Sequence, residues 1–530
     1  MDPLGGFDPW LLVLAGVLGA VLLAVVGTWP VCALLLRMYR RRIDRGMRTM
    51  ARPARANARP MPPEDGDNRR IAVREVEVRG HPPLLELARR KARRSQLLFA
   101  LLGLVYGMAA AAAYHIVDQA QWRPVRVAAY TLLLGWPVVP TLLALSAARR
   151  RIWWLSWAAY VAAVTTLLAL AGESTIEVLT MAIPMLFVLA TSTRALRGAA
   201  WLVAPGLMLL GLTVAVWWPI LIYLRYRAPF DRFAWTLLAT AIGLPVLLVA
   251  YGWTIVRVYQ AKWASDQTLL ILQWWFVTAL WWTLLLGTQG EYAALLGLAP
   301  YALLVLLLFV IALLRRRQVG RPVRLLLLRT FGARERSSRL LHDLTRQWRW
   351  IGSVELITGP DLASETLEPD EFLDFIRGRL ARSFVAEEAL VERRLRELDL
   401  RSDRDGRYRV NELLCQDQTW QLALEGLVAV VDAVLIDLRD FNARHSGVRH
   451  EVQRLVALLP LSRVVALIDQ TTDRDALQAA LVRAAIMAPQ SSPLQTDPDP
   501  VFRVVDWDSR NDDVGRLIRA LTQAAAADGI

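Results

Sequence analysis

Long apolar stretches fill the chain up to about residue 318, and they constrain its fold more than any other feature. A helix needs about 20 apolar residues to cross the roughly 30 Å hydrocarbon core of a bilayer, and it satisfies its own backbone hydrogen bonds there. The sequence therefore predicts a multi-pass protein whose main partner is the lipid bilayer. Nine stretches meet this requirement: Trp10–Leu36, Ser95–Val117, Val127–Ala148, Ile152–Leu170, Thr175–Thr193, Ala199–Leu224, Phe233–Val258, Leu269–Leu286 and Tyr292–Leu314.

The fifth stretch is the weakest of the nine, because it is short and carries Glu177 and Pro184. Without it the chain would have eight spans, and its two ends would lie on the same side of the membrane. Eight and nine spans both stay open on the sequence alone.

Basic residues beside the stretches predict the orientation, since Lys and Arg resist translocation. Arg is abundant after the first stretch and recurs near Arg150, Arg194, Arg257 and Arg316. With these segments inside, the N-terminus is outside and the C-terminal part lies in the cytoplasm, at a bacterial inner (plasma) membrane. The segment 224–232 departs from the pattern, because it carries three Arg and is assigned outside.

The formal charge of +14 could suit a nucleic acid, but its distribution favours the membrane. Much of the excess lies between Arg37 and Arg94, where it would face anionic lipid headgroups. No nucleic-acid partner is expected. Within this basic linker, Met50–Arg70 is predicted to be flexible, and Pro82–Gln96 is predicted to be a helix lying on the inner leaflet.

Cysteine and histidine usage argues against a metal centre. Cys32 and Cys415 cannot build a disulfide framework or a cysteine-based metal site, and the five His lack metal-ligand spacing. Ionisable residues near the stretches are functional candidates by default. His115, Asp118 and Glu177 are close enough to predicted helix ends to reach water, so transport ranks below the other functions.

From Arg321 onward, short apolar runs alternate with amphipathic stretches. Such alternation predicts a doubly wound, mostly parallel sheet of about five strands, covered by helices on both faces. The domain organisation is then a first span (1–36), a basic linker (37–94), eight further spans (95–317) and a Rossmannoid α/β domain (321–530). The expected strands are Arg324–Phe331, Ser353–Thr358, Ala433–Leu438, Arg463–Ile468 and Val501–Val505.

The carboxyl ends of the strands supply the candidate site, because ligands of doubly wound sheets bind beyond them. Asp437 and Glu451, near Arg329 and Arg439, could bind a ribose hydroxyl, orient a phosphate or act on a glycosidic bond. We therefore predict Glu451 and Asp437 as catalytic residues. The predicted nucleotide-binding residues are Arg329, Phe331, Asp361, Arg439, Asn442 and Gly447; further strand-end residues are Thr330, Thr358, Gly359, Phe441 and Asp469.

A structural reading of the same residues stays open. Asp437 and Arg439 could pair within the fold, and Glu451 could be solvated. The sequence has no glycine-rich phosphate loop of the G-x-G-x-x-G or G-x-x-x-x-G-K kind to decide between the two readings.

The stretch Val434–Glu451 (VLIDLRDFNARHSGVRHE) resembles the Toll/interleukin-receptor-like and nucleoside-deoxyribosyltransferase-like group of Rossmannoid domains. The chain also resembles uncharacterised bacterial multi-pass membrane proteins that end in such a domain, in which Asn411–Trp420 has counterparts. The resemblance covers Arg324–Val505 and implies that Glu451 contacts ribose during cleavage of an N-glycosidic bond. Active members often show Ser-x-x-Trp-Cys-x-x-Glu, whereas Arg444, Gly447 and Val448 stand before Glu451 here.

These observations lead to an expectation of membrane-linked signalling or defence through binding or cleavage of NAD or a nucleotide. No bound cofactor is required, because NAD or a nucleotide would be the substrate or ligand. A non-enzymatic sensor or scaffold that self-associates as a homo-oligomer is the alternative.

Overall fold

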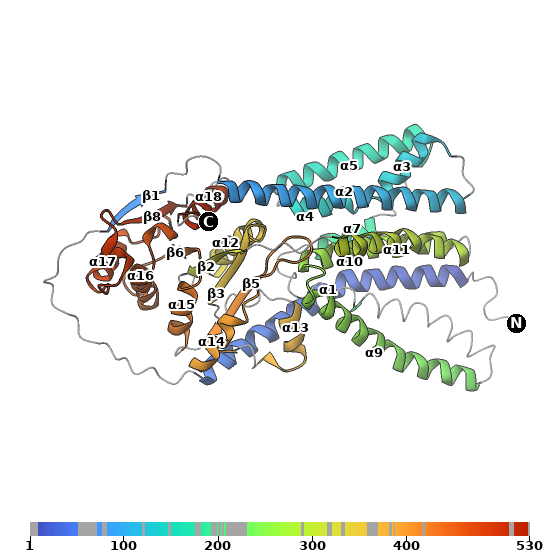
Figure 1. Ribbon diagram of the computed structural model, residues 1–530. Helices are drawn as coiled ribbons and strands as arrows, with labels where there is room; N and C mark the ends of the chain where they lie inside the picture. Colours follow the sequence, from blue (N-terminus) through green and yellow to red (C-terminus); the bar gives the residue numbers. More distant parts are fainter. Residues whose placement is uncertain are drawn as a thin grey trace. The chain divides into compact units, whose positions relative to one another are not determined.

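The computed structural model divides into two units, each described here by itself (Figure 1). One unit holds Met1–Met38, Ala92–Arg317 and Glu368–Phe372, and the other holds Tyr39–Lys91, Gln318–Leu367 and Leu373–Ile530. The structure describes residues 9–50, 71–76, 82–118, 122–146, 150–174, 182–191, 199, 203, 206–207, 230–287, 291–314, 321–329, 334–357, 369–380, 384–385, 387–415, 419–507 and 513–527.

Apolar helices make up the first unit. In the described residues, three helices are long and apolar enough to cross a membrane, or four if one bent pair is a single span. The predicted span Ala199–Leu224 falls almost wholly outside the described residues, and so does the start of Thr175–Thr193. The helices are α1 (Pro9–Met50), α2 (Pro83–Val117), α3 (Pro124–Leu134), α4 (Val138–Ser146), α5 (Arg150–Ala171), α7 (Ala182–Thr191), α9 (Phe230–Gln260), α10 (Asp266–Gly287) and α11 (Glu291–Leu314).

The predicted span Val127–Ala148 is the bent pair, because α3 and α4 meet at 52°. Pro137 and Pro140 have no backbone N–H for the helix ladder, which favours a break here. Gly107 of α2 lets the backbones come close, since an added Cβ would lie 2.4 Å from the Thr131 carbonyl oxygen. The expectation of unbroken apolar helices is therefore wrong at this point.

Two further element boundaries differ from prediction. The helix predicted for Pro82–Gln96 is not separate but is the first part of α2, because no Gly or Pro interrupts the chain before Gly103. Likewise, α1 continues past Leu36 through the basic segment to Met50. The predicted flexible part of the linker, 51–70, lies outside the described residues.

Buried tryptophans connect helices of the first unit through their indole N–H groups. Trp274 of α10 donates to Thr191 Oγ1 at 3.0 Å, and Trp275 donates to Thr141 Oγ1 at 3.3 Å. Because a buried N–H without a partner is costly, these bonds fix α10 against α7 and α4.

An eight-stranded sheet, parallel throughout, forms the second unit, so the predicted parallel sheet is confirmed and the predicted count of five strands is wrong. All five expected strands occur, as β2 (Val323–Arg329), β3 (Gly352–Ile357), β6 (Ala433–Asp437), β7 (Val464–Ile468) and β8 (Val501–Asp506). The additional strands are β1 (Ala72–Glu75), β4 (Phe384–Val385) and β5 (Val410–Cys415).

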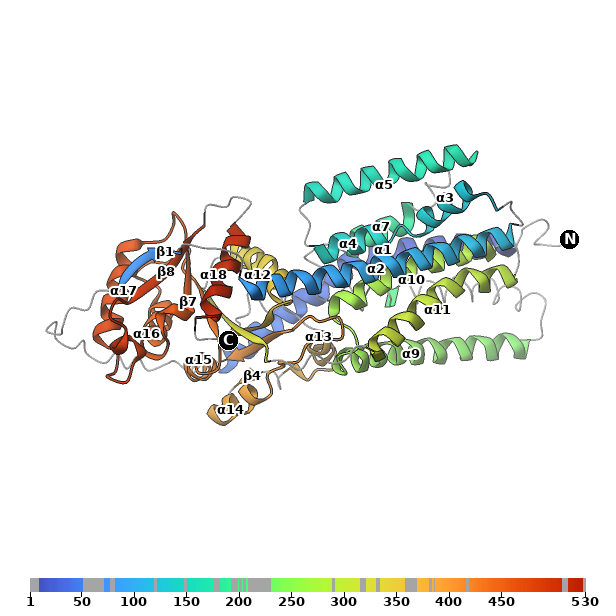
Figure 2. The same ribbon diagram turned by 45° about the horizontal axis from the view of Figure 1, so that its top comes forward.

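Strand β1 comes from the predicted basic linker and pairs with β8 at one edge of the sheet (Figure 2). The Ala72 N–H donates to the Pro500 carbonyl oxygen at 3.0 Å, and Ile71 is buried in the sheet's hydrophobic core. An ion pair between Arg74 and Asp499, at 3.2 Å, adds a surface contact. The sheet unit therefore includes part of 37–94 and does not begin at residue 321.

The ends of the two long helices that belong to the sheet unit also pack within it. Tyr39 of α1 meets Phe375 edge-on at 5.3 Å, and the Arg42 guanidinium donates to the Gly378 carbonyl oxygen at 3.5 Å. The Lys91 ammonium of α2 lies 5.7 Å from the centre of the Tyr408 ring. These contacts explain why Tyr39–Lys91 groups with the sheet.

The strand order is β1-β8-β7-β6-β2-β3-β5-β4. Without β1 and β4, the remaining six strands follow the 3-2-1-4-5-6 order of dinucleotide-binding sheets, with β2 as the first strand. The chain leaves β2 toward β3 on one side and returns to β6 on the other. The order therefore reverses between β2 and β6, where Arg329 is the register partner of Asp437.

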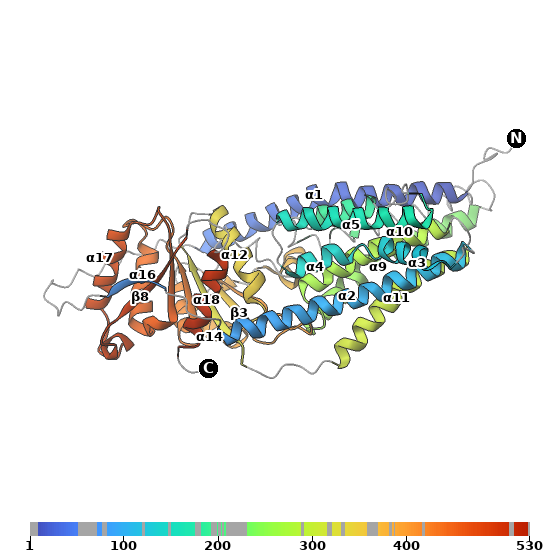
Figure 3. The same cartoon turned by 90° about the horizontal axis from the view of Figure 1, so that it is seen from above.

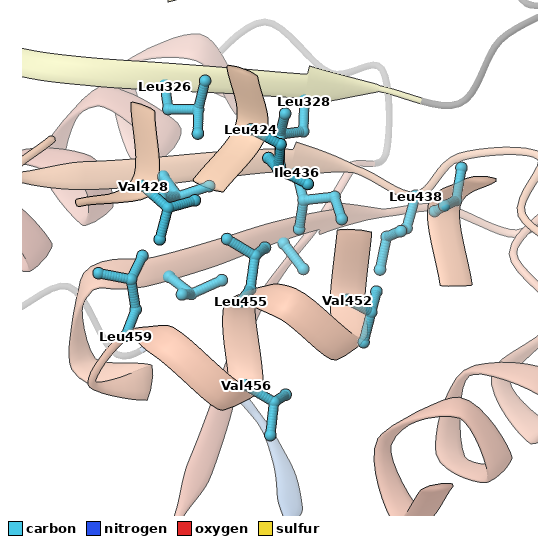
Figure 4. Packing of buried hydrophobic residues seen from close by; sticks show 14 of the residues in the cluster. Leu326, Leu328, Leu424, Val428, Ile436, Leu438, Val452, Leu455, Val456 and Leu459 are labelled. Atoms are coloured by element: carbon cyan, nitrogen blue, oxygen red, sulfur yellow. The ribbon is translucent and has the colours of Figure 1, made fainter. Parts of the chain in front are cut away.

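Helices cover both faces of the sheet. Helices α12 (Arg334–Trp348) and α18 (Asp513–Ala525) contact each other on one face. The other face carries α14 (Glu388–Arg396), α15 (Trp420–Val428), α16 (Ser446–Leu458) and α17 (Arg474–Ile486); α13 (Pro369–Ile376) precedes β4 (Figure 3). Leu326, Ile436 and Leu438 pack there against Leu424 and Leu455 (Figure 4). Because both faces are covered, all five residues of β6 are buried.

Candidate functional site

The carboxyl end of β6 carries a buried ion pair. Arg439 donates from Nε to Asp437 Oδ1 at 2.8 Å and from Nη2 to Asp437 Oδ2 at 2.7 Å, and its backbone N–H reaches Oδ1 at 3.2 Å. Only 4% of the Asp437 side chain and 6% of the Arg439 side chain is exposed. The two predicted site residues are therefore brought together, and they engage each other in a two-pronged contact.

Acidic neighbours hold the Arg439 guanidinium charged. Burial alone would lower its pKa, but the hydrogen bonds and charge of Asp437, together with the charges of Asp469 and Asp440, raise the pKa above its ordinary value. The guanidinium carbon also lies 5.6 Å from the centre of the Trp507 ring, just beyond β8. Residues from the ends of three neighbouring strands thus converge at Arg439.

The loops that follow β6 and β7 are bonded to each other. Asp440 has a φ of 62°, a left-handed conformation that suits Asp, and its N–H donates to Thr471 Oγ1 at 2.9 Å. Thr471 donates to Asp469 Oδ1 at 2.5 Å, and Thr472 donates to the Leu438 carbonyl oxygen at 3.0 Å. These bonds fix the backbone that a ligand at this edge would meet.

Asn442 and Gly447 shape the start of α16. The Asn442 side-chain oxygen accepts from the Arg444 N–H at 3.0 Å, and the Asn442 N–H donates to His445 Nδ1 at 3.2 Å. Gly447 is the second residue of α16, and an added Cβ there would meet no atom within 4 Å. Phe441, also at this edge, is fully buried in the core.

Glu451 is buried on α16, on the face that carries Val448, Val452 and Leu455. The alternative of a solvated Glu451 is therefore wrong. A carboxylate is rarely buried to this extent, because removing its charge from water is costly.

The remaining predicted residues are placed only in part. The backbone of Arg329 ends β2 beside Asp437. Phe331 and Asp361 lie outside the described residues, as do Thr330, Thr358 and Gly359.

Sequence reasoning missed Thr471, Thr472 and Trp507 as members of this edge. Trp507 directly follows β8, so the strand-end rule that selected the other residues could have found it. The threonines follow Asp469 by only two and three residues and could have been found in the same way.

A second polar cluster joins ends of helices in the first unit and contains two of the predicted ionisable candidates, Asp118 and His115; Arg126 and Glu173 were not predicted. The Arg126 guanidinium lies 2.6 Å from Glu173 and 3.5 Å from Asp118, and 5.9 Å from the centre of the Tyr130 ring. His115 is buried, and its Nδ1–H donates to the Ala111 carbonyl oxygen at 2.8 Å, because a carbonyl oxygen can only accept. Glu177, the third predicted ionisable candidate, lies outside the described residues.

The described residues hold no group of three or more His, Cys, Asp or Glu that could bind a metal ion. Cys32 and Cys415 are both buried and free.

Comparisons of the chain with protein-family models, with curated proteins and with solved structures give no match.

Proposed function

We propose that this chain is an integral membrane protein of the bacterial inner membrane whose cytoplasmic Rossmannoid domain binds NAD or a nucleotide in signalling or defence. The observation that carries the proposal is the reversal of strand order between β2 and β6. In open parallel sheets, ligands bind beyond the carboxyl ends at such a reversal. The predicted residues Asp437, Arg439 and Arg329 belong to these two strand ends.

The Asp437–Arg439 pair supports the site by fixing the loop that follows β6. Its two-pronged contact and the bonds from Asp440 and Thr472 leave this backbone preorganised. Arg329, at the end of the neighbouring strand, would then orient a phosphate, with Phe331, Asp361, Asn442 and Gly447 as further ligand-binding candidates.

Glu451 is the proposed catalytic carboxylate. As an N-glycosidic bond breaks, positive charge develops on the ribose, and a nearby carboxylate stabilises that charge and binds a ribose hydroxyl. The base leaves with the electron pair of the broken bond, water adds to the ribose carbon, and the proton that water loses passes to the solvent. The burial of Glu451 supports this role, because electrostatic stabilisation is stronger away from water.

The test is release of nicotinamide from NAD by the full chain purified in detergent. Wild-type protein should release nicotinamide, and Glu451→Gln should lower the rate about 100-fold or more while the protein remains folded. Glu392→Gln, which removes an exposed carboxylate on α14, should leave the rate unchanged. Equal rates for wild type and Glu451→Gln would reject catalysis by Glu451.

A non-enzymatic sensor or scaffold is the second candidate. It is favoured by the pairing of both Asp437 carboxylate oxygens with Arg439, since such a pair can serve the fold alone. NAD and nucleosides that stay intact after long incubation with concentrated wild-type protein would support it.

The proposed topology has nine spans, with the N-terminus outside. It requires the end of the second span, the start of the third and the end of the fourth to lie on one side. In agreement with this, Asp118, Arg126 and Glu173 come from those three positions, and Arg126 forms ion pairs with both carboxylates.

A further inference from the structure

Helices α16 and α17 lie side by side (Figures 1 and 3). Residues of these two helices line a groove of about 370 Å³. Small-molecule sites in proteins begin at about this volume. Five of the ten lining residues are alanines, among them Ala476 and Ala480, and they give the groove an apolar floor of small side chains.

The rim of the groove is basic. Arg449 of α16 and Arg483 of α17 line it from opposite helices, and none of the ten lining residues is Asp or Glu. In the described part of the chain neither arginine has an ion-pair partner, whereas the neighbouring Arg454 and Arg474 pair with Glu425 and Asp506. Two like charges facing one groove without a counter-charge favour an anion between them.

Two polar atoms of the lining residues have no hydrogen-bond partner among the described residues. They are Arg449 Nε and His450 Nε2, and both are enclosed by protein. Burial and the charge of Arg454, only partly offset by Glu425, lower the pKa of His450, so its ring is neutral at pH 7. A buried donor without a partner is costly, and a ligand oxygen would satisfy it.

We propose that this groove binds a phosphate monoester carried on a flat ring, the chemistry of a mononucleotide. Arg449 and Arg483 hold the phosphate, and the ring lies on the alanine floor. The site lies between α16 and α17, and of its lining only Ala443 comes from the loop after β6. It is not formed by the β2 and β6 strand ends, so it goes beyond the proposed function and does not depend on it.

The test uses the full chain in detergent and the photoreactive probe 8-azido-AMP, with labelled peptides identified by mass spectrometry. Labelling should fall on the α16–α17 peptides, and AMP should compete for it. The double variant Arg449→Gln/Arg483→Gln should weaken AMP competition at least tenfold. Arg474→Gln, which removes the same charge from an exposed position on α17, should not.

Two further competitors test whether the groove recognises both the phosphate and the ring, and a second variant tests whether the ligand lies in the groove. Adenosine and inorganic phosphate should each compete at least tenfold more weakly than AMP. Ala479→Glu, at an exposed position in the groove, should weaken AMP binding by adding a negative charge, and Ala479→Gln should not.

Several results would overturn the site. Adenosine or phosphate that competes as well as AMP would reject the combined recognition of phosphate and ring. Unchanged labelling and AMP competition in the double variant would show that Arg449 and Arg483 do not bind the phosphate. Label confined to the loop after β2 and to residues 438–442 would reject the groove while leaving the proposed function intact.

Discussion

Glu355 is a buried carboxyl group of the sheet unit whose ionisation is strongly perturbed by the fold. It is fully buried on β3, where Ser353 donates to its carboxylate at 2.8 Å and Arg324 Nε lies 3.9 Å away. Burial raises its pKa to about 7; Ser353, Arg324 and Asn411 lower it in part, and the charge of Asp432 raises it further. The folded protein therefore holds this proton more tightly than the unfolded chain does.

The raised pKa of Glu355 determines how the stability of the folded protein changes with pH. Between the ordinary value of 4.5 and about 7, the unfolded chain loses the Glu355 proton while the folded protein keeps it, so stability falls as pH rises through this window. Glu355→Gln should remove this part of the pH dependence. At pH 8 the variant should be more stable than wild type by up to about 3 kcal/mol, as 1.4 kcal/mol per pKa unit implies.

Labelling of Cys415 in increasing urea measures the effect, because this thiol is buried on β5 and becomes reactive when the sheet unfolds. With Cys32→Ala as background, the wild-type midpoint should be lower at pH 8 than at pH 5.5. The Glu355→Gln midpoint should change less. An equal fall in both proteins would contradict the role of Glu355.

Individual site residues were predictable to different degrees. Asp437 and Arg439 are two positions apart at a strand end, so the sequence allowed their pairing as an alternative. The contact of Arg439 with Trp507 depends on β7 lying between β6 and β8, which residue spacing alone cannot predict. The burial of Glu451 likewise depends on which face of α16 meets the sheet.

At the scale of elements, β1 couples the segment between the first two long helices to the sheet. The Ala72 N–H donates to the carbonyl oxygen of Pro500, just before β8, at 3.0 Å, and the Val76 N–H donates to that of Val504 at 2.9 Å. Arg74 is two residues from each, so its N–H points toward β8 as well. Arg74→Pro should therefore detach β1. Hydrogen exchange of the full chain in detergent should then be at least tenfold faster in β1 and at Val501–Val504.

The matched change Val73→Pro should have a smaller effect, because the N–H of Val73 points away from β8. Arg74→Ala controls for the lost ion pair with Asp499, which is exposed and contributes little. If both proline variants exchanged at the wild-type rate, β1 would not be a stable part of the sheet.

Strand length and pattern explain which elements the sequence could predict. The apolar runs of β2, β6 and β7 are buried on both faces and were predicted within about two residues at each end. Strand β1 is short and mostly exposed, with charged Arg74 and Glu75, and β4 has only two residues. Such edge strands lack the apolar pattern, because one side faces no neighbour.

At the scale of the whole molecule, the apolar stretches and the sheet were predictable because each follows from composition over many residues. The boundaries of the sheet unit in the sequence could not be predicted in this way. Residues Tyr39–Lys91 belong to it because of contacts such as Lys91 with Tyr408, which join segments far apart in the sequence. Helix periodicity carries no information about such contacts.

Residue accessibility in intact cells tests most directly that the apolar helices cross the membrane and hold the sheet unit on the cytoplasmic side. In a Cys32→Ala/Cys415→Ala background, Ser174→Cys, next to Glu173, should react with an impermeant maleimide added outside. Ser491→Cys, in an exposed loop of the sheet unit, should react only after the cells are permeabilised. Labelling of Ser491→Cys in intact cells, or protection of Ser174→Cys there, would contradict the account.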